Sequence, residues 1–375
     1  MDLTELRDKI DEIDKEIVKL YEERMEISES VAEYKIEHGK NVLDAEREKS
    51  KLSKLKSLTH NDFNALGITE LFEQIMSMSR KKQYALMTDR GMFGRTPFIP
   101  VDKLETDNAK VVFQGINGAY SEAAMIAFFG ENVDSHSVST FREAMRSIDE
   151  GSADYAVLPI ENSSSGIVNA NYDLLTEFEN YIVAEQMISI DNCLIALPGV
   201  KESEIDTVYS HPQALMQCVP FLDDHPSWKQ ISYSNTAMSA EKIKNDGLRN
   251  QAAIAGERAA KAYGLEVLRR DINSSEGNST RFIIVTNQKI FVKDAKKISL
   301  SFEIPHRSGS LYRILSHFIY NDLNMTKIES RPIPDRPWEY RFFVDFDGNL
   351  NDPSTKNALR GLREETRGLK ILGNY

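Results

Sequence analysis

The sequence has little cysteine, no long apolar run and no start that resembles a leader. Cys193 and Cys218 are its only cysteines among 375 residues, and neither belongs to a CxxC spacing. This excludes a disulfide framework and favours buried, reduced thiols. No apolar run is long enough to span a bilayer, and MDLTELRDKI lacks the regions of a signal peptide. We therefore expect a cytoplasmic protein without a membrane partner.

Positive charge is also scarce. The chain has 46 Lys and Arg residues against 58 Asp and Glu residues, a net charge of −12. Such a balance is typical of a soluble protein and argues against a nucleic-acid partner, which needs a basic face. Anionic small molecules would have to be bound by a few locally placed Arg and Lys side chains.

Proline is absent before Pro97, and residues 1–38 also lack glycine. Apolar residues there recur at three-, four- and seven-residue steps, which predicts one amphipathic helix. They are Leu6, Ile10, Ile13, Ile17, Leu20, Ile27, Val31 and Tyr34. Asp2 with Glu5 can cap the start of this helix, and Gly39 can end it. A helix of about 50 Å cannot bury the stripe within its own domain, so a helical partner is implied.

The expected pattern of helices and strands divides the chain into several domains. Residues 1–86 are predicted to be all-helical, and residues 87–110 have the Gly, Pro and missing periodicity of a linker. Residues 111–287 alternate β-branched runs with helical patterns, which predicts an α/β domain with largely parallel strands. Residues 297–375 follow a βαββαβ order, which leaves a sheet face or edge free to pair with a copy.

Polar side chains recur at helical spacing in the first segment. Arg24 and Lys35 are eleven residues apart, about three turns, and so share nearly the same helix face. Two further helices are expected over 44–58 and 68–86. Each carries a polar i,i+4 pair, Asp44 with Glu48 and Ser79 with Gln83. Taken alone, such pairs are more typical of a solvated helix face than of a binding site.

The order LRDKI, EERMEIS, AEYK, DAEREK and SxxxQ resembles the all-helical chorismate mutase family over residues 1–86. The resemblance implies a pocket lined by Arg7, Arg24, Lys35, Asp44, Arg47, Glu48, Ser79 and Gln83. Arg7 lies about 100° around the helix from Arg24, which is consistent with Arg7 contributing its side chain to the site of a partner subunit. The implied reaction is the Claisen rearrangement of chorismate to prephenate, a unimolecular step without proton transfer.

That reaction assigns roles to the implied pocket. The two carboxylates of chorismate can be held by forked donors, with Arg7 and Arg24 as candidates and Arg47 as a further one. Negative charge accumulates on the ether oxygen as its bond breaks, so donors aimed there stabilise the transition state. Lys35 and Gln83 are the candidates for that role, and Glu48 can accept from the substrate hydroxyl.

The α/β segment carries polar residues where strands are expected to end. Gly115 and Gly118 lie between a strand and a helix, where backbone N–H groups can meet a carboxylate, although a tight turn explains them equally well. No GxG occurs in the chain, so the dinucleotide fingerprint is absent. Three polar clusters, each of which could be a loop or cap, are Glu161–Asn162–Ser163, Ser210–His211–Pro212–Gln213 and Asn278–Ser279–Thr280–Arg281–Phe282.

With their Thr-Arg-Phe triplet, these clusters resemble prephenate dehydratases over residues 111–287. The resemblance implies two α/β lobes with the site in the cleft between them. Dehydration with loss of carbon dioxide expels hydroxide, so it needs a proton donor but no metal and no cofactor. The resemblance implies that Thr280 is that donor. We favour a positioned hydrogen-bond donor over a formal acid for it, because a threonine hydroxyl is a weak acid. Implied pocket residues are Glu161, Asn162, Ser210 and Gln217.

The roles of two residues near the implied dehydratase pocket each have two interpretations. Arg281 could hold a substrate carboxylate or form an ion pair within the fold. His211 precedes Pro212, and we favour a hydrogen-bonded strand end over a general acid for it.

The last segment resembles the ACT regulatory domain attached to prephenate dehydratases. The motifs are Gly309–Ser310–Leu311 at a helix start and Glu329–Ser330–Arg331–Pro332 at a strand end, where a plain turn is the alternative. They imply that L-phenylalanine binds between paired domains, with the helix N-terminus meeting its carboxylate. Glu329 or backbone carbonyls would then take the ammonium group.

The sequence therefore predicts a bifunctional enzyme of phenylalanine biosynthesis that turns chorismate into phenylpyruvate under feedback inhibition by L-phenylalanine. A homodimer or homotetramer is expected, because the first helix and the last sheet should both seek partners. Two rivals are a sensor that keeps the cleft but lacks catalysis, and a mutase joined to a prephenate dehydrogenase. The absent glycine fingerprint disfavours the second rival.

Overall fold

The computed structural model describes residues 2–92, 97–274, 277–306, 308–334 and 336–375. Its contacts divide the chain into two compact units. The first joins Met1–Pro97 with Lys296–Lys370, and the second joins Phe98–Ala295 with Ile371–Tyr375. Among the described residues, no helix combines the length and the apolar character needed to cross a membrane.

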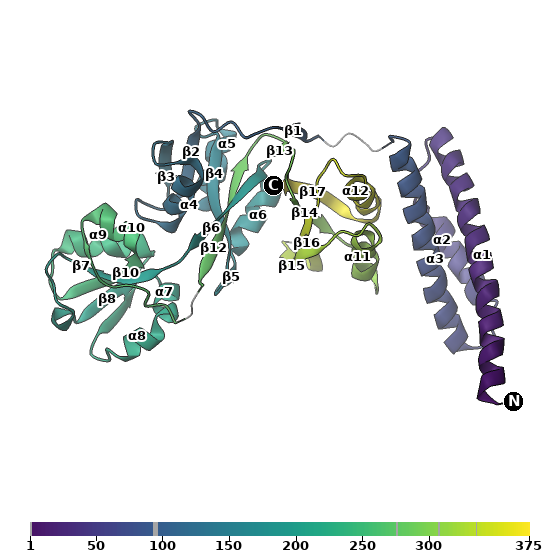
Figure 1. The fold of residues 1–375 in the computed structure, drawn as a ribbon, viewed down its shortest axis with the longest axis horizontal. Coiled ribbons are helices and arrows are strands. Elements are labelled where there is room, and N and C mark those ends of the chain that lie inside the picture. The colour runs from purple at the N-terminus through teal and green to yellow at the C-terminus, as the bar shows by residue number, and fades with distance from the viewer. Residues whose placement is uncertain (1, 93–96, 275–276, 307, 335) are drawn as a thin grey trace. The chain divides into compact units, whose positions relative to one another are not determined.

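Three helices form the N-terminal part of the first unit (Figure 1). They are α1 (Leu3–Glu37), α2 (Ala45–Lys56) and α3 (Asp62–Asp89), and both α1 and α2 pack against α3. The expected capping box is present, because the side chain of Asp2 accepts from the backbone of Glu5 and the reverse bond also forms. The third helix starts before the expected residue 68, since Asn61 caps it.

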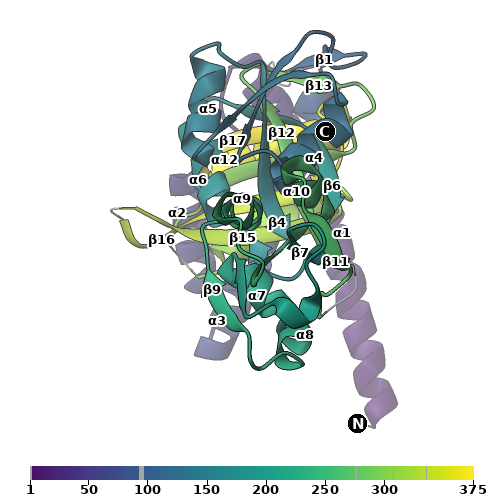
Figure 2. The same cartoon turned by 90° about the vertical axis from the view of Figure 1, so that its left-hand side faces the viewer.

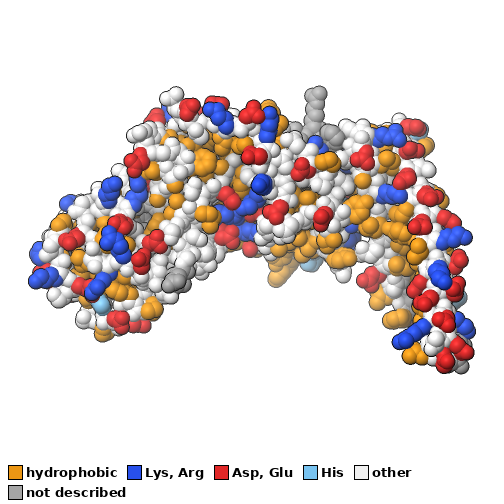
Figure 3. All heavy atoms as spheres, viewed as in Figure 1, with side chains coloured by type: hydrophobic (Ala, Val, Ile, Leu, Met, Phe, Trp, Pro, Cys, Tyr) orange, Lys and Arg blue, Asp and Glu red, His pale blue; other side chains and the backbone are white. Residues whose placement is uncertain are grey.

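The apolar stripe of α1 is exposed. Its residues range from Val31, 36% exposed, to Ile27, 65% exposed. Within α1 the buried residues are Met25, Ser28 and Ala32, which lie nearer its C-terminal end. Figure 3 shows hydrophobic side chains open along the helical part. The described residues of one chain therefore leave this stripe without a cover.

The C-terminal part of the first unit follows the order β14, α11, β15, β16, α12 and the start of β17, whose residues from Ile371 onward belong to the second unit. Their bounds are β14 (Lys297–Glu303), α11 (Ser310–Tyr320), β15 (Met325–Ile333), β16 (Arg336–Asp347), α12 (Pro353–Glu365) and β17 (Arg367–Asn374). The strand order is β15-β16-β14-β17, with β16 antiparallel to both β15 and β14. Both α11 and α12 also pack against α3 of the helical part.

The second unit consists of two α/β lobes (Figures 1 and 2). In the first lobe the strand order is β6-β12-β4-β2-β3. These strands are β2 (Lys110–Gln114), β3 (Asp134–Val138), β4 (Tyr155–Asn162), β6 (Tyr181–Ser189) and β12 (Ser279–Thr286), and β5 (Gly166–Ile167) pairs with β4. The helices are α4 (Tyr120–Phe129), α5 (Phe141–Asp149) and α6 (Asn169–Glu177).

The second lobe has the strand order β11-β7-β10-β8-β9. Its strands are β7 (Asn192–Ala196), β8 (Thr207–Ser210), β9 (Lys229–Ser232), β10 (Gln251–Gly256) and β11 (Glu266–Arg269). Its helices are α7 (Pro212–Gln217), α8 (Val219–Asp223), α9 (Thr236–Asp246) and α10 (Glu257–Tyr263), with the short turn η1 (Glu202–Glu204).

Both sheets are mixed, so the expectation of largely parallel pairing was wrong. In the first lobe β2 is parallel to β3 and β4, but β12 is antiparallel to β4 and β6. In the second lobe β8 is parallel to β9 and β10, but β7 is antiparallel to β10 and β11. The chain passes between the lobes twice. The strand that follows each crossing, β7 in the second lobe and β12 in the first, runs antiparallel to both of its neighbours. A β-branched run does not report strand direction.

The stretch expected as a linker has some regular structure. The third helix continues to Asp89, and β1 (Ile99–Val101) pairs in parallel with β13 (Ile290–Val292). Residues 93–96 of this stretch lie outside the described residues. A three-residue strand with a distant partner has no periodic signal, which is why the sequence pattern missed it.

Candidate active sites

The helical part brings four of the predicted polar residues together between α1 and α3. The ammonium of Lys35 donates to the side-chain oxygen of Gln83 over 3.2 Å and to the carbonyl of Val42 over 2.6 Å. One turn earlier on α3, the guanidinium of Arg24 donates to the hydroxyl of Ser79. Cationic groups from α1 and neutral side chains from α3 thus line one helical interface.

The cations at this interface are poorly solvated. Ser79 and Gln83 are each 6% exposed. Burial lowers the pKa of Lys35, opposed by the carboxylate of Asp44, and burial likewise lowers the pKa of Arg24. Because burial disfavours the charged form of both, an anionic ligand between them would restore the lost stabilisation. The interface is therefore suited to a small anion.

The second helix contributes two of the predicted residues. Asp44 caps α2, since its Oδ1 accepts from the backbone N–H of Arg47 over 3.1 Å. Glu48 is held by Arg80 of α3, whose Nη1 lies 2.7 Å from each carboxylate oxygen. Arg80 is 5% exposed and was missed by sequence analysis. It follows Ser79 directly, but no spacing distinguishes it from its lysine neighbours.

The side chains of Arg7 and Arg47 are exposed. No hydrogen bond or ion pair among the described residues joins either side chain to the Lys35–Gln83 pair. For Arg7 this agrees with its place well around α1 from Arg24. Its expected service to a partner subunit stays a prediction.

In the first α/β lobe, two predicted residues meet where β4 ends and β12 begins. The amide nitrogen of Asn162 donates to the hydroxyl oxygen of Thr280 and to the side chain of Asn278, each over 2.9 Å. Thr280 is 8% exposed. Because its oxygen accepts from Asn162, its hydroxyl hydrogen is left to donate elsewhere. Thr280 is thus oriented as a donor.

The predicted pocket residue Glu161 lies apart from this pair. It stands opposite Arg281 in the β4–β12 register, one position from the Asn162–Thr280 pair and so on the other sheet face. Arg281 contacts Glu161 and Glu185, each over 3.3 Å. The structure therefore shows an ion pair within the fold for Arg281, and it does not bring Glu161 together with Thr280.

The second lobe uses its predicted polar residues largely for internal bonds. Ser210 is fully buried at the end of β8 and donates to the carbonyl of Ile254 on β10 over 2.6 Å. His211 caps α7, with Nδ1 accepting from the backbone of Gln213 over 3.3 Å. Burial lowers the pKa of His211, so its ring is neutral near pH 7. This is the geometry of a strand end and not that of a charged acid.

Gln217 ends α7 beside a buried amide that sequence analysis missed. Its side-chain oxygen lies 3.4 Å from the amide nitrogen of Asn192, which also donates to Asn273 over 2.8 Å. The hydroxyl of Tyr120, on α4 of the other lobe, donates to Asn192 over 3.3 Å. Gln217 is thus joined to the first lobe through one asparagine. Asn192 sits in an unremarkable strand pattern, which gave no signal.

A cavity of about 260 Å³ lies where the two lobes meet. Its lining includes Gly118–Tyr120 at the start of α4, Ile188, Ser189 and Asp191 near the crossing, and Gly256–Arg258 at the start of α10. A Cβ at Gly118 would stand 2.7 Å from the Cα of Ala259, so glycine is required for this approach. Thr280 lies beside the lining, because Ile188 is its register partner.

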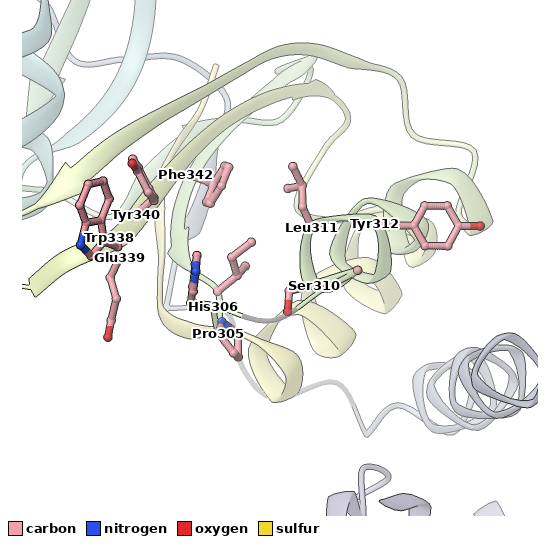
Figure 4. A pocket seen from close by; sticks show the side chains of 11 residues that line it. Pro305, His306, Ser310, Leu311, Tyr312, Trp338, Glu339, Tyr340 and Phe342 are labelled. Atoms are coloured by element: carbon pink, nitrogen blue, oxygen red, sulfur yellow. The ribbon is translucent and has the colours of Figure 1, made fainter. Parts of the chain in front are cut away.

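A second cavity, of about 200 Å³, opens at the start of α11 (Figure 4). The predicted residues Gly309, Ser310 and Leu311 line it, together with His306, Trp338, Tyr340 and Phe342. Glu329, Ser330 and Arg331 lie on β15 and do not line this cavity. The aromatic lining from β16 was not foreseen.

Comparisons with known proteins match two segments of the chain to known families. A model described as chorismate mutase type II matches residues 6–84, and one described as prephenate dehydratase matches residues 111–290. A curated relative from Buchnera aphidicola subsp. Schizaphis graminum (strain Sg), a bifunctional chorismate mutase/prephenate dehydratase, is 35% identical over 381 residues. The match covers 100% of this chain and 96% of the relative. The chain belongs to the bifunctional chorismate mutase/prephenate dehydratase family.

Solved structures resemble the larger part of this family member. A prephenate dehydratase from Arthrobacter aurescens in complex with L-Phe is 32% identical, with a TM-score of 0.66. It covers 71% of this chain and 89% of its own. A structure described as GqqA, a novel type of quorum quenching acylases, is 28% identical with a TM-score of 0.65, covering 70% and 96% respectively.

In this bifunctional chorismate mutase/prephenate dehydratase homologue, the two candidate sites lie in different matched segments. The Lys35–Gln83 and Arg24–Ser79 contacts fall within the segment matched to mutases. The Asn162–Thr280 contact falls within the segment matched to dehydratases. Among the described residues, no group of three or more His, Cys, Asp or Glu side chains is placed to hold a metal ion.

Proposed function

We propose that this protein rearranges chorismate to prephenate in its helical part and converts prephenate to phenylpyruvate in its α/β unit. The mutase activity is supported by Lys35, which lies 3.2 Å from Gln83 at an interface of buried neutral donors. The dehydratase activity is supported by Thr280, whose hydroxyl is oriented by Asn162 over 2.9 Å. A relative that matches over the full chain supports the presence of both activities together.

In the mutase step, Arg24 would hold one carboxylate of chorismate in the compact conformer. Lys35 and the amide of Gln83 would donate to the ether oxygen, where negative charge grows as the C–O bond breaks. Because the reaction is unimolecular, positioning and charge stabilisation account for the whole acceleration. Arg7 of a partner and Arg47 would hold the remaining carboxylate.

In the dehydratase step, the ring C–O bond breaks and the hydroxyl leaves as water after it accepts a proton. The C–C bond to the ring carboxylate breaks at the same time, and its electron pair completes the aromatic ring as carbon dioxide departs. Thr280, held by Asn162, would donate this proton to the leaving hydroxyl through the hydrogen bond between them. Gln217 would complete the pocket from the second lobe, whereas the hydroxyl of the buried Ser210 is used inside the sheet.

The C-terminal part, residues 297–375, would be an ACT domain that binds L-phenylalanine and inhibits the dehydratase. Its βαββαβ order and the cavity at the start of α11 support this assignment. The dehydratase from Arthrobacter aurescens that was solved with L-Phe is a relative with the same ligand class. Residues 1–86, 87–110 and 111–287 would be the mutase domain, linker and dehydratase domain.

We also infer a homodimer or homotetramer assembled through α1. Its stripe stays exposed along most of the helix, for example at Ile13, 59%, and Ile17, 54%. A second α1 would cover the stripe and bring Arg7 to the partner's site. A cytoplasmic location remains a prediction, and the free, buried thiols of Cys193 and Cys218 agree with it.

Incubation of the purified protein with chorismate tests this function directly. We expect chorismate to disappear, phenylpyruvate to form, and L-phenylalanine to inhibit its formation cooperatively. Unchanged chorismate and prephenate, with L-phenylalanine still bound, would instead identify a sensor without catalysis. The acylase-like neighbour favours no second function, because it is less similar and covers less of the chain than the bifunctional relative.

A further inference from the structure

Arg80 joins the helical site to the C-terminal part of the same unit. Its Nη1 lies 2.7 Å from both oxygens of Glu48 on α2, and its Nε lies 2.9 Å from Oε1 of Glu365, the last residue of α12. The side chain of Arg80 is 6% exposed and that of Glu365 is 9% exposed. A buried guanidinium is thus shared by two carboxylates from distant parts of the chain.

Glu365 is itself held in its charged form. Burial alone would raise the pKa of this carboxyl, but His317 of α11 and Arg80 outweigh it and lower the pKa to about 2. The ring nitrogen of His317 lies 3.3 Å from the same carboxylate oxygen that Arg80 contacts. Glu365 is therefore a permanent, buried anion that fixes one side of the guanidinium.

We propose that Arg80 is a positioning residue of the mutase reaction, and that Glu365 on α12 fixes Arg80 in place. Glu48 is the carboxylate expected to accept a hydrogen bond from the substrate hydroxyl. Nη1 contacts both oxygens of Glu48 while Nε contacts Glu365, so a planar guanidinium anchored on one side directs the carboxylate of Glu48, which a flexible side chain alone does not achieve. The C-terminal part thereby supports the mutase site through Glu365, which contacts Arg80 and not the substrate.

A neighbouring contact provides a matched control. Glu364 lies beside Glu365 on α12 and accepts from the backbone of Leu43 and from the hydroxyl of Tyr84, each over 3.0 Å. It thus also joins α12 to the helical part, but it makes no hydrogen bond or ion pair with Arg80 or Glu48 among the described residues. Glu364→Gln and Glu365→Gln each remove one charge from the same end of the same helix.

The kinetic consequence differs from that of simple misfolding. The substrate hydroxyl is unchanged by the rearrangement, so a contact with it is equally strong in the ground state and in the transition state. Loss of such a uniform contact raises KM and leaves kcat nearly unchanged. A merely structural role of Arg80 would instead displace Ser79 and Gln83 on α3, and loss of the Gln83 donor would lower kcat.

The test measures mutase kcat and KM of the full chain in Arg80→Gln, Arg80→Lys, Glu365→Gln, Glu364→Gln and the double variant Arg80→Gln Glu365→Gln. We expect KM to rise about tenfold in Arg80→Gln, as for one lost charge-assisted contact, with kcat within about twofold. Glu365→Gln should raise KM about threefold, and Arg80→Lys should restore part of the loss. The charge of Glu364 acts on Lys35 and not on Arg80, so Glu364→Gln should keep KM within about twofold of the wild type, and the KM of the double variant should not exceed that of Arg80→Gln.

A fall in kcat with KM unchanged would overturn the proposal, as would equal effects of Glu364→Gln and Glu365→Gln or additive effects in the double variant. Helical content measured by circular dichroism, together with the thermal unfolding midpoint, reports that the unit carrying each substitution is folded. If Arg80→Gln fails this control, the comparison of Glu365→Gln with Glu364→Gln decides. The inference rests on the proposed mutase activity. A wild type that leaves chorismate unchanged would refute that function, whereas active variants without the KM pattern would refute only the role of Arg80.

Discussion

Lys35 on α1 donates from its ammonium group to the side-chain oxygen of Gln83 on α3 over 3.2 Å. Because that oxygen is occupied, the amide NH₂ of Gln83 is left to donate to a ligand. Lys35 also keeps donors beyond those used for Gln83 and Val42. The contact therefore presents one charged and one neutral donor side by side, as the developing ether oxygen anion requires.

Gln83→Glu should confine mutase activity to acidic pH. Only a protonated carboxyl can donate in place of the amide, and Lys35 beside it would favour the ionised form. Mutase rates measured against pH should therefore rise steadily toward acid in the variant, while dehydratase turnover of added prephenate stays as in the wild type. A flat profile for the variant would remove Gln83 from this role.

The mutase should also lose activity at high pH through Lys35. Burial lowers the pKa of Lys35, so its charge is lost as pH rises through a value below the usual lysine range of about 10.4. We expect kcat/KM to fall there, because this parameter reports the free enzyme. In Lys35→Arg, residual activity should show no such fall, since a guanidinium stays charged. Constant kcat/KM in the wild type up to the ordinary lysine range would contradict this account.

The exposed stripe of α1 predicts how assembly and catalysis are linked. Ile13→Lys Ile17→Lys should give a monomer that loses about tenfold or more of its mutase activity, because a buried stripe does not accept two charges and Arg7 would no longer reach a partner. Its dehydratase activity should persist. Light scattering after gel filtration gives the mass. Asp11→Lys, on the opposite helix face by 100° per residue, is the control and should keep the wild-type mass. An unchanged mass for the double variant would place the assembly surface elsewhere.

Trp338 offers a direct probe of the cavity proposed to bind the effector. It is one of two tryptophans, it lines the cavity at the start of α11, and it is 77% exposed. In Trp228→Phe, which removes the buried second tryptophan, L-phenylalanine should change the fluorescence of Trp338 over the same concentrations that inhibit the dehydratase. Inhibition without any fluorescence change would mean that the effector binds away from this cavity.

The parts of the fold that depend on local chemistry could be predicted from the sequence. The capping box of Asp2 and Glu5 and the missing helix breakers define α1. Strand and helix alternation likewise identified β2, α4 and β4. Strand direction could not be predicted, because it depends on how the chain crosses between lobes. The stripe predicted a helical partner without indicating which one.

The candidate site shows the same division. Helical spacing suffices to align Arg24 with Lys35, but Arg80 was missed because its partners Glu48 and Glu365 are 32 and 285 residues away. Ser210 stands in a polar cluster, yet its hydroxyl donates to Ile254, 44 residues later, inside the sheet. Neighbours that come from distant strands or helices leave no mark in a local pattern.

The most direct test of the two-site account is the product formed from chorismate by Thr280→Ala, with Thr280→Ser as the matched control. Removal of the oriented donor should lower phenylpyruvate formation by about a hundredfold or more, the usual contribution of a positioned proton donor, so prephenate should accumulate. Chorismate consumption should stay at the wild-type rate, and Thr280→Ser should recover much of the second step. Continued formation of phenylpyruvate by Thr280→Ala, or loss of chorismate consumption in a folded variant, would contradict the account.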